Sequence, residues 1–195
     1  MASSADRAPD ERALIERART GDEAAFEQLV AMHADRVYGA LRRFGLDPGE
    51  AEDVAQEAFL RAWRAIGRFQ GRAQLSTWLY RIAFNEAQRR LARRGPALEA
   101  DPGGEDRLRR VPGPPGEAPE ALLVGREFEE MLQRALAELP AEWRMAVVLR
   151  DLEGLSTAEA ARAAGVRDAA FKSRLHRGRM RLRELLEPYL EAGSE

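Results

Sequence analysis

Residues 154–185 read GLSTAEAARAAGVRDAAFKSRLHRGRMRLREL, and this stretch decides the fold of the C-terminal half of the chain. Ser156 and Glu159 have the Ser-x-x-Glu spacing of a capping box, which predicts the start of a short alanine-rich helix. Gly165 is expected to end that helix in a left-handed conformation. A second helix follows, with Asp168 as its predicted N-cap. Two helices joined by a tight corner are the layout of a helix-turn-helix, whose second helix enters the major groove of DNA.

The second helix of this unit is unusually basic. Between residues 172 and 183 it carries six cations and no carboxylate, whereas a solvated helix usually mixes both signs. A solvated face on an ordinary bundle helix is the alternative interpretation, and the capped first helix and the glycine corner argue against it. Gly178 within this helix costs about 1 kcal/mol relative to alanine, and close packing is the expected reason.

Composition limits what the rest of the chain can be. Its 195 residues, of which 45% are hydrophobic, suffice for two small domains. The absence of cysteine excludes disulfides, thiolate metal sites and thiol nucleophiles, and it suits a reducing cytoplasm. No apolar run approaches the length of about 18 residues that a membrane span requires, and the polar N-terminus does not resemble a signal peptide. We therefore expect a cytoplasmic protein that does not insert into membranes.

A segment rich in proline and glycine divides the chain. Residues 95–120 contain six prolines and five glycines, a composition that excludes a helix or a central strand. We predict an all-α protein of two small helical domains joined by a flexible linker. The predicted parts are a disordered N-terminus at 1–10, a first domain at 11–94, the linker at 95–122, a second domain at 123–190 and a disordered tail at 191–195.

The first domain is predicted to consist of helices throughout. Its helix starts include Asp22 and Asp47, the latter followed by Pro48 in the first turn and by an acid at the third position. A connector at residues 68–74 combines an aromatic ring, a glycine, two cations and two amides, which together can hold an unstacked base. Ser76 is predicted to cap the next helix, which carries a polar, cationic stripe suited to phosphates and base edges.

Three residues of this domain admit more than one interpretation. Phe69 in the connector either contacts a base or packs in the core. Trp78, one turn into its helix, has the spacing of a core anchor, which is the favoured interpretation. His33 also has core spacing, and a half-buried helix residue is the favoured interpretation because no metal-ligand pattern lies near it.

Two strings are specific enough to indicate a family. They are EDVAQEAFLRAWRAIGRFQGRAQLSTWLYRIAFNEAQRRLARR at 52–94 and LPAEWRMAVVLRDLEGLSTAEAARAAGVRDAAFKSRLHRGRMRLRELL at 139–186. Together they resemble regions 2 and 4 of the extracytoplasmic-function sigma factors of bacterial RNA polymerase, in the family's order and with its two-module layout. The resemblance implies a non-catalytic subunit that binds core polymerase, directs it to minus-10 and minus-35 promoter elements and helps to open the DNA.

The resemblance also implies which residues make these contacts. The helix that begins near residue 47 would dock on the clamp coiled coil of the largest polymerase subunit through Asp53, Gln56, Glu57 and Arg61. The connector and the helix after it would open the minus-10 element and capture a flipped base through Phe69, Gln70, Arg72, Gln74, Arg81, Asn85 and Arg89. The helix from residue 168 would read the minus-35 element through Lys172, Ser173, Arg174, His176, Arg177 and Arg179.

By the same resemblance, the partners are core RNA polymerase, through its clamp coiled coil and flap, promoter DNA and an anti-sigma factor. The chain would act as a monomer and would hold no cofactor or metal. It departs from the family pattern at Ala170, which lacks a hydroxyl, and at Phe171, which is larger than the usual aliphatic residue. A promoter preference therefore does not transfer from relatives.

Other functions remain as alternatives. A repressor or response-regulator output domain also uses a helix-turn-helix, but it would dimerise on palindromic DNA. A helical adaptor without a DNA role would show no salt-dependent binding to promoters. An enzyme is the weakest alternative, because the sequence has no phosphate-binding glycine-rich lysine motif and no nucleophile elbow, and its two histidines lie far apart.

Overall fold

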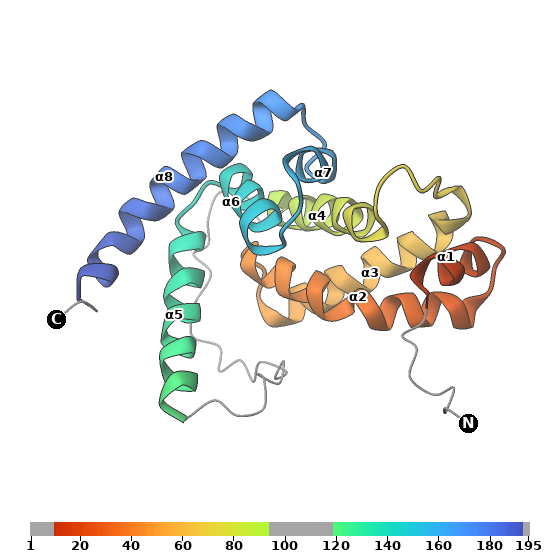
Figure 1. Cartoon of the computed structure of the whole chain (residues 1–195), viewed down its shortest axis with the longest axis horizontal. Helices are drawn as coiled ribbons and strands as arrows, with labels where there is room; N and C mark the ends of the chain where they lie inside the picture. The colour runs from red at the N-terminus through yellow and green to blue at the C-terminus, as the bar shows by residue number, and fades with distance from the viewer. Residues whose placement is uncertain (1–9, 94–118, 193–195) are drawn as a thin grey trace, which may run out of the picture.

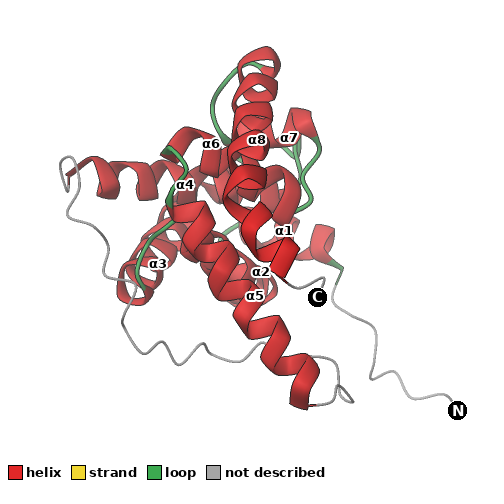
Figure 2. Cartoon of the chain, turned by 90° about the vertical axis from the view of Figure 1, so that its left-hand side faces the viewer, coloured by secondary structure: helices red, strands yellow, loops and turns green. Residues whose placement is uncertain are grey.

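The computed structural model describes residues 10–93 and 119–192, and the regular structure within these residues is entirely helical (Figures 1 and 2). The first module contains α1 (Glu11–Arg19), α2 (Glu23–Arg43), α3 (Pro48–Ala65), the 3-10 turn η1 (Ile66–Arg68) and α4 (Leu75–Arg93). The second module contains α5 (Pro119–Ala137), α6 (Ala141–Val147), the π-helical turn η2 (Val148–Leu152), α7 (Thr157–Ala163) and α8 (Asp168–Ala192). The prediction of an all-α protein is confirmed.

Most of the predicted helix starts are also confirmed. The Asp22 carboxylate accepts a hydrogen bond from the amide of Ala25 at 3.0 Å, so Asp22 caps α2. Asp47 and Glu50 form a complete capping box at the start of α3, with Pro48 as the first helical residue.

Two predicted caps are wrong by one or two positions. The amide of Trp78 donates to the carbonyl of Gln74 at 3.2 Å, so α4 begins at Leu75 and Ser76 lies inside its first turn. Asp168 is likewise the first helical residue of α8 and not its N-cap. Its carboxylate still lies at the positive end of the helix dipole, which stabilises α8 from within the first turn.

The boundaries of the second module differ from the predicted ones. Helix α5 begins at Pro119, inside the predicted linker, because proline suits the first turn and the residues after it favour a helix. Helix α8 continues past Pro188 to Ala192 and so extends into the predicted tail. The remainder of the predicted linker, the N-terminal nine residues and the last three residues lie outside the described part of the chain.

The first module is a helical bundle in which α3 packs against α4 and α2, and α1 lies along α2. Aromatic pairs hold it together: the ring centroids of Phe26 and Trp63 lie 5.1 Å apart, and those of Phe44 and Phe84 lie 5.0 Å apart. His33 is 9% exposed, more deeply buried than the half-buried residue that was predicted. Its Nε2 atom lies 2.8 Å from a carboxylate oxygen of Glu11, a contact that ties α2 to α1.

The helix-turn-helix of the second module has the predicted corner. Gly165 has a φ of +67°, a left-handed conformation that glycine adopts without strain. The amide of Val166 donates to the carbonyl of Ala161 at 3.0 Å and that of Gly165 to Arg162 at 3.2 Å, the two bonds of a Schellman motif. At the other end of α7, Ser156 and Glu159 form the predicted capping box.

Replacing Gly178 with alanine is expected to destabilise the chain, although alanine is the better helix former by about 1 kcal/mol. A Cβ atom at this position would lie 2.9 Å from Val147 Cγ2 and 3.1 Å from the carbonyl oxygen of Trp143. Overpacking of this kind costs about 1–3 kcal/mol, so a net loss of about 1 kcal/mol is expected in thermal unfolding. The control variant is Ala170→Gly, at an exposed position of α8, where the change in stability reports the difference in helix propensity between alanine and glycine without a packing clash. A more stable Gly178→Ala variant would contradict the packing explanation.

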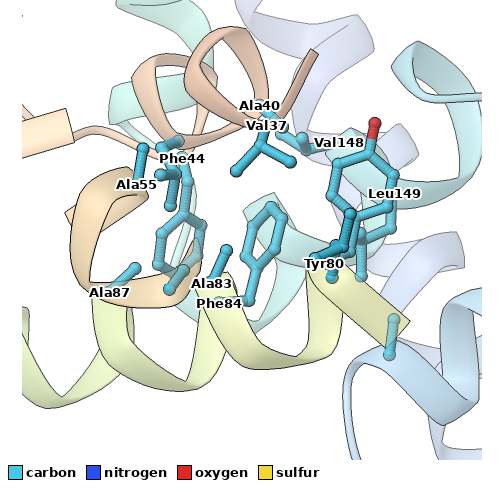
Figure 3. Packing of buried hydrophobic residues seen from close by; sticks show 14 of the residues in the cluster. Val37, Ala40, Phe44, Ala55, Tyr80, Ala83, Phe84, Ala87, Val148 and Leu149 are labelled. Carbon is cyan, nitrogen blue, oxygen red and sulfur yellow. The ribbon is translucent and has the colours of Figure 1, made fainter. Parts of the chain in front are cut away.

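The two modules pack directly against each other. Tyr80 and Phe84 of α4 and Val148 and Leu149 of η2 are each at most 1% exposed and belong to one continuous hydrophobic cluster, to which Val37 of α2 contributes (Figure 3). Helix α4 also packs against α7. The core therefore extends through both modules.

Candidate nucleic-acid interface

Helix α8 turns one face to the core and the opposite face to solvent. Phe171, Leu175 and Gly178 are buried, and their spacing of four and three residues places them on one side of the helix. Four of the predicted minus-35 residues lie on the other side and are exposed: Lys172, Ser173, His176 and Arg177. We call these four the α8 outer face. Within the described residues, none of these four side chains contacts a carboxylate. Lys172 and Arg177 are therefore available to an anionic ligand.

The other two predicted minus-35 residues are paired with carboxylates of the second module. Arg174 contacts Glu142 at 3.0 Å. Arg179 makes a bidentate contact with Asp151, at 2.9 Å from Nε and 2.5 Å from Nη2, and the hydrogen bond raises the pKa of Arg179. Both side chains therefore brace α8 against α6 and η2 in this structure.

The residues predicted for the minus-10 element form a second exposed surface. Arg81, Asn85 and Arg89 recur every four residues along α4 and are exposed, and Arg89 also contacts Glu86 at 3.2 Å. The connector before α4 adds three further exposed side chains, those of Gln70, Arg72 and Gln74. We call these six residues the α4 surface. It combines cations with amides, the groups that contact phosphates and base edges.

Phe69 does not belong to this surface. Its side chain is 7% exposed, and its ring centroid lies 5.2 Å from that of Trp78, which packs against the core. The core interpretation therefore describes both aromatic residues in this structure, and the Phe69 ring is not accessible to a base. Gly71, with a φ of +65°, turns the connector after Phe69, so that its polar neighbours face outward.

The predicted polymerase-docking residues lie along α3 and form ion pairs. Asp53 contacts Arg90 of α4 at 3.0 Å, and Arg61 contacts both Glu57 at 2.7 Å and Glu86 at 3.1 Å. The hydrogen bond that Arg61 donates to the Glu57 carboxylate raises the pKa of Arg61. Gln56 is exposed beside them. The contacts with Arg90 and Glu86 connect α3 to α4. The four predicted docking residues remain at the surface, and we call them the α3 stripe.

One exposed residue of this stripe was not predicted from the sequence. Leu60 is 52% exposed, although it lies one turn beyond Gln56 and Glu57 on the polar side of α3. The helical spacing could have revealed it, because a leucine three and four residues from two polar stripe positions must share their face. Leu60 adds apolar surface to this row of charges, and a partner that covered it would gain from removing that surface from water.

No helix in the described residues is long and apolar enough to cross a membrane. The same residues contain no group of three or more histidine, cysteine or acidic side chains that could hold a metal ion.

Comparisons with known proteins match both modules. The family model described as Sigma-70 region 2 matches residues 29–96, and the model described as Sigma-70, region 4 matches residues 129–182. The RNA polymerase sigma-H factor of Pseudomonas aeruginosa is 36% identical over 186 residues, which cover 91% of this chain and 94% of that protein. The ECF RNA polymerase sigma-E factor of Escherichia coli is 33% identical over 191 residues, covering 92% and 96%.

Two solved structures with the same fold are complexes. CnrH in complex with the cytosolic domain of CnrY has a TM-score of 0.66 and 30% identity, covering 92% of this chain and 99% of that one. RpoE in complex with the anti-sigma factor NepR, from Bartonella quintana, has a TM-score of 0.65 and 25% identity, covering 83% and 96%. The similarity thus extends over both modules in one chain.

Proposed function

Because this chain belongs to the extracytoplasmic-function sigma factors, the non-catalytic subunits that direct core RNA polymerase to promoters, we propose that it contacts promoter DNA through two exposed surfaces, one in each module. The modules correspond to regions 2 and 4, for which we propose residues 11–94 and 119–192. We place the chain in the cytoplasm, where the polymerase acts.

We assign the minus-35 element to the α8 outer face. The observation that carries this assignment is that Lys172 and Arg177 are exposed on the recognition helix and have no carboxylate partner among residues 10–93 and 119–192. Arginine can read guanine through two hydrogen bonds in the major groove, whereas lysine is suited to phosphates. Arg174 and Arg179 would have to leave their carboxylates to reach DNA, so we assign them to positioning α8.

We assign the minus-10 element to the α4 surface. Its cations would contact phosphates of the displaced strand, and its amides would hydrogen-bond to the edges of unstacked bases. With Phe69 buried under the connector, base capture would depend on Gln70, Arg72 and Gln74.

The polymerase contact is assigned to the α3 stripe of Asp53, Gln56, Glu57 and Arg61, with Leu60 at its centre. Other members of the family are controlled by anti-sigma factors, and two solved structures similar to this chain contain a second protein, in one case named as an anti-sigma factor. We propose the same form of control for this chain.

Leu60→Ala is expected to weaken binding to core polymerase by about tenfold, because burial of the exposed half of a leucine contributes about 1–1.5 kcal/mol. Met32→Ala is the matched control, since Met32 is 41% exposed on α2 and lies outside the stripe. The chain would be reconstituted with core polymerase from a compatible bacterium, and affinity and transcript start sites would be measured. Equal losses in the two variants would refute the docking assignment, and the absence of chain-dependent transcripts would refute the DNA assignments.

A further inference from the structure

The basic part of the first module contains a single carboxylate. Residues 61–94 hold nine arginines, and Glu86 of α4 is the only acidic residue among them. Its side chain is 13% exposed, and its Oε2 atom lies 3.1 Å from Arg61 and 3.2 Å from Arg89. Arg61 belongs to the α3 stripe and Arg89 to the α4 surface. Glu86 is therefore shared between a residue proposed to contact polymerase and one proposed to contact DNA.

The two arginines hold Glu86 in different ways. Arg61 is fixed by a second carboxylate, because its Nε atom donates to Glu57 of the same helix at 2.7 Å while its Nη1 atom faces Glu86. Arg89 lies one turn after Glu86 on α4, and its side chain is 57% exposed. An ion pair with so exposed a partner contributes little to stability. The contact between Glu86 and Arg89 can therefore break at low cost, and Arg61 still neutralises the carboxylate.

The paired arginine of the other DNA-binding helix differs in this respect. Arg179 of α8 makes two hydrogen bonds to Asp151, whose side chain is 26% exposed. Among residues 10–93 and 119–192, no second cation contacts Asp151. Moving Arg179 to a phosphate would leave a partly buried carboxylate without a partner, which is costly. Of the two arginines, Arg89 is thus the one that can exchange its carboxylate for a phosphate.

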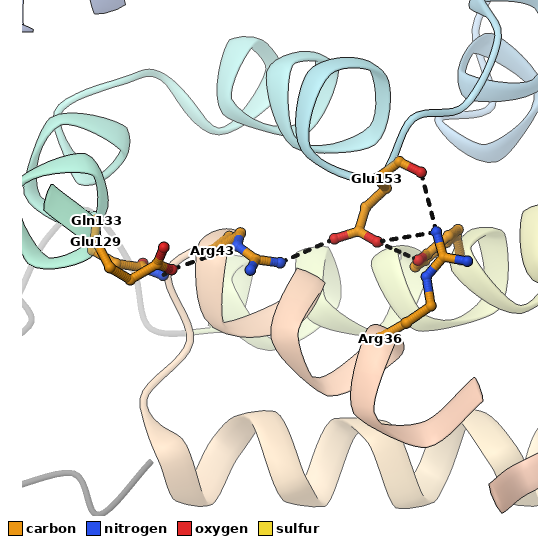
Figure 4. Close-up of polar contacts among 6 residues, drawn as sticks. Arg36, Arg43, Glu129, Gln133 and Glu153 are labelled. Carbon is orange, nitrogen blue, oxygen red and sulfur yellow. Dashed lines mark hydrogen bonds and ion pairs between the residues drawn. The ribbon is translucent and has the colours of Figure 1, made fainter. Parts of the chain in front are cut away.

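Two other charged groups that are withdrawn from water have partners outside both DNA surfaces. Glu153 follows η2, its side chain is 4% exposed, and it accepts a hydrogen bond from Tyr80 at 2.5 Å and contacts Arg43 at 3.2 Å (Figure 4). The guanidinium of Arg144 donates to three backbone carbonyls, those of Phe44, Ala137 and Leu139. These groups stabilise the packing of helices. Glu86 differs from both, because one of its partners belongs to the α4 surface.

The carboxylate of Glu86 competes with DNA for Arg89. A phosphate that binds Arg89 must take the place of Glu86, so the free energy of the internal ion pair is subtracted from that of the new contact. Phosphates are the same in every sequence, and the competition therefore lowers the affinity of the α4 surface for all sequences alike. The contacts of its amides with base edges then contribute a larger share of the binding free energy.

We propose that Glu86 is a positioning residue that restrains Arg89 and thereby sets the affinity of the α4 surface for the phosphates of single-stranded DNA. This inference rests on the minus-10 function proposed above for that surface. In the free chain Arg89 contacts Glu86. On a bound strand Arg89 exchanges this carboxylate for a phosphate, while Arg61 keeps Glu86 in place.

Replacing Glu86 with glutamine tests the inference, since glutamine preserves the size of the side chain and removes its charge. Glu86→Gln should bind a labelled oligodeoxythymidine of about 12 nucleotides about fivefold more tightly at low salt. The gain should shrink as salt is added, because the competition is electrostatic. Fluorescence anisotropy with the full chain measures both. Glu52→Gln is the matched control, because it makes the same charge change at an exposed position outside the α3 stripe and the α4 surface.

The variant Arg89→Ala shows where the gain arises. It should weaken binding only slightly in the unmodified chain, whereas in the Glu86→Gln background it should remove most of the gain. An equal gain with and without Arg89 would overturn the inference, because Glu86 would then act only as a charge that repels DNA. The gain should also be the same for an oligonucleotide of equal length and mixed sequence. A gain confined to one of the two oligonucleotides would contradict a phosphate contact.

Arg81→Ala separates this inference from the proposed function. Arg81 is exposed on the α4 surface, so its removal should weaken binding to both oligonucleotides. If Arg81→Ala binds like the unmodified chain, or if neither binds, the minus-10 assignment is wrong. If Arg81→Ala binds more weakly but Glu86→Gln binds like the unmodified chain, the assignment stands and the inference about Glu86 is wrong.

A variant of the opposite sign keeps the test decisive if thermal unfolding shows that Glu86→Gln does not fold. Arg61→Gln leaves Arg89 as the partner of Glu86 and should therefore weaken binding to oligodeoxythymidine by about threefold. Arg64→Gln removes the same charge from an exposed position of α3 and is its control. Equal affinities of Arg61→Gln and Arg64→Gln would overturn the inference.

Discussion

Replacing Lys172 and Arg177 together with alanine is expected to lower the affinity of the holoenzyme for a minus-35-dependent promoter by roughly 100-fold, while core polymerase is bound as before. Each residue would lose a phosphate or base contact worth about 1–3 kcal/mol, and a total of about 3 kcal/mol corresponds to that factor. Both side chains are exposed on the α8 outer face, so their removal leaves the packing of the helix intact. The measurement is promoter binding as a function of salt concentration. If both residues contact phosphates, the slope of log affinity against log salt should fall by about 1.8.

The matched control is the double variant Arg181→Ala with Arg183→Ala, which removes the same charge from the same helix. Arg181 already contacts Glu184 at 3.0 Å, and both residues lie beyond the α8 outer face. This variant should weaken binding much less. Similar losses in the two double variants would mean that only the general charge of α8 matters, and a loss of core binding would mean that the second module has been assigned wrongly.

Arg144→Leu is expected to reduce the free energy of unfolding by about 3 kcal/mol, because it deprives three carbonyls of their charged donor at a half-buried site. Burial lowers the pKa of Arg144, yet an arginine remains charged at neutral pH. Chemical denaturation would measure the loss. Arg134→Leu is the control, since Arg134 is exposed on α5 and donates to the carbonyl of Glu130 within its own helix. A loss below about 1 kcal/mol in Arg144→Leu would show that water replaces the guanidinium.

The sequence was sufficient to predict features that depend on nearby residues. The capping boxes at Asp47 and Ser156 and the corner at Gly165 each involve residues within a few positions of one another, so their spacing reveals them. The buried side of α8 has the same local origin, because Phe171, Leu175 and Gly178 follow the helical period. Even Gly178 could be explained in advance, because a glycine within a helix requires a reason that close packing supplies.

Features that depend on distant contacts could not be predicted. Glu153 precedes the Gly154 corner and has no pattern that distinguishes it from an ordinary surface acid, yet it is buried against side chains 73 and 110 residues away. Arg179 is indistinguishable from Arg177 in a basic run, and only the position of Asp151 separates their roles. Phe69 could be placed in the core or on DNA until its distance from Trp78 was known.

The continuous core across α4 and η2 has a consequence for the cooperativity of folding. Because Tyr80, Phe84, Val148 and Leu149 share one buried cluster, neither module can lose its packing without exposing part of the other. The chain is therefore expected to be a single cooperative unit in heat denaturation, with equal calorimetric and van't Hoff enthalpies. Without this shared cluster, each module would rely on its own smaller core, and the chain would behave as two weaker folding units.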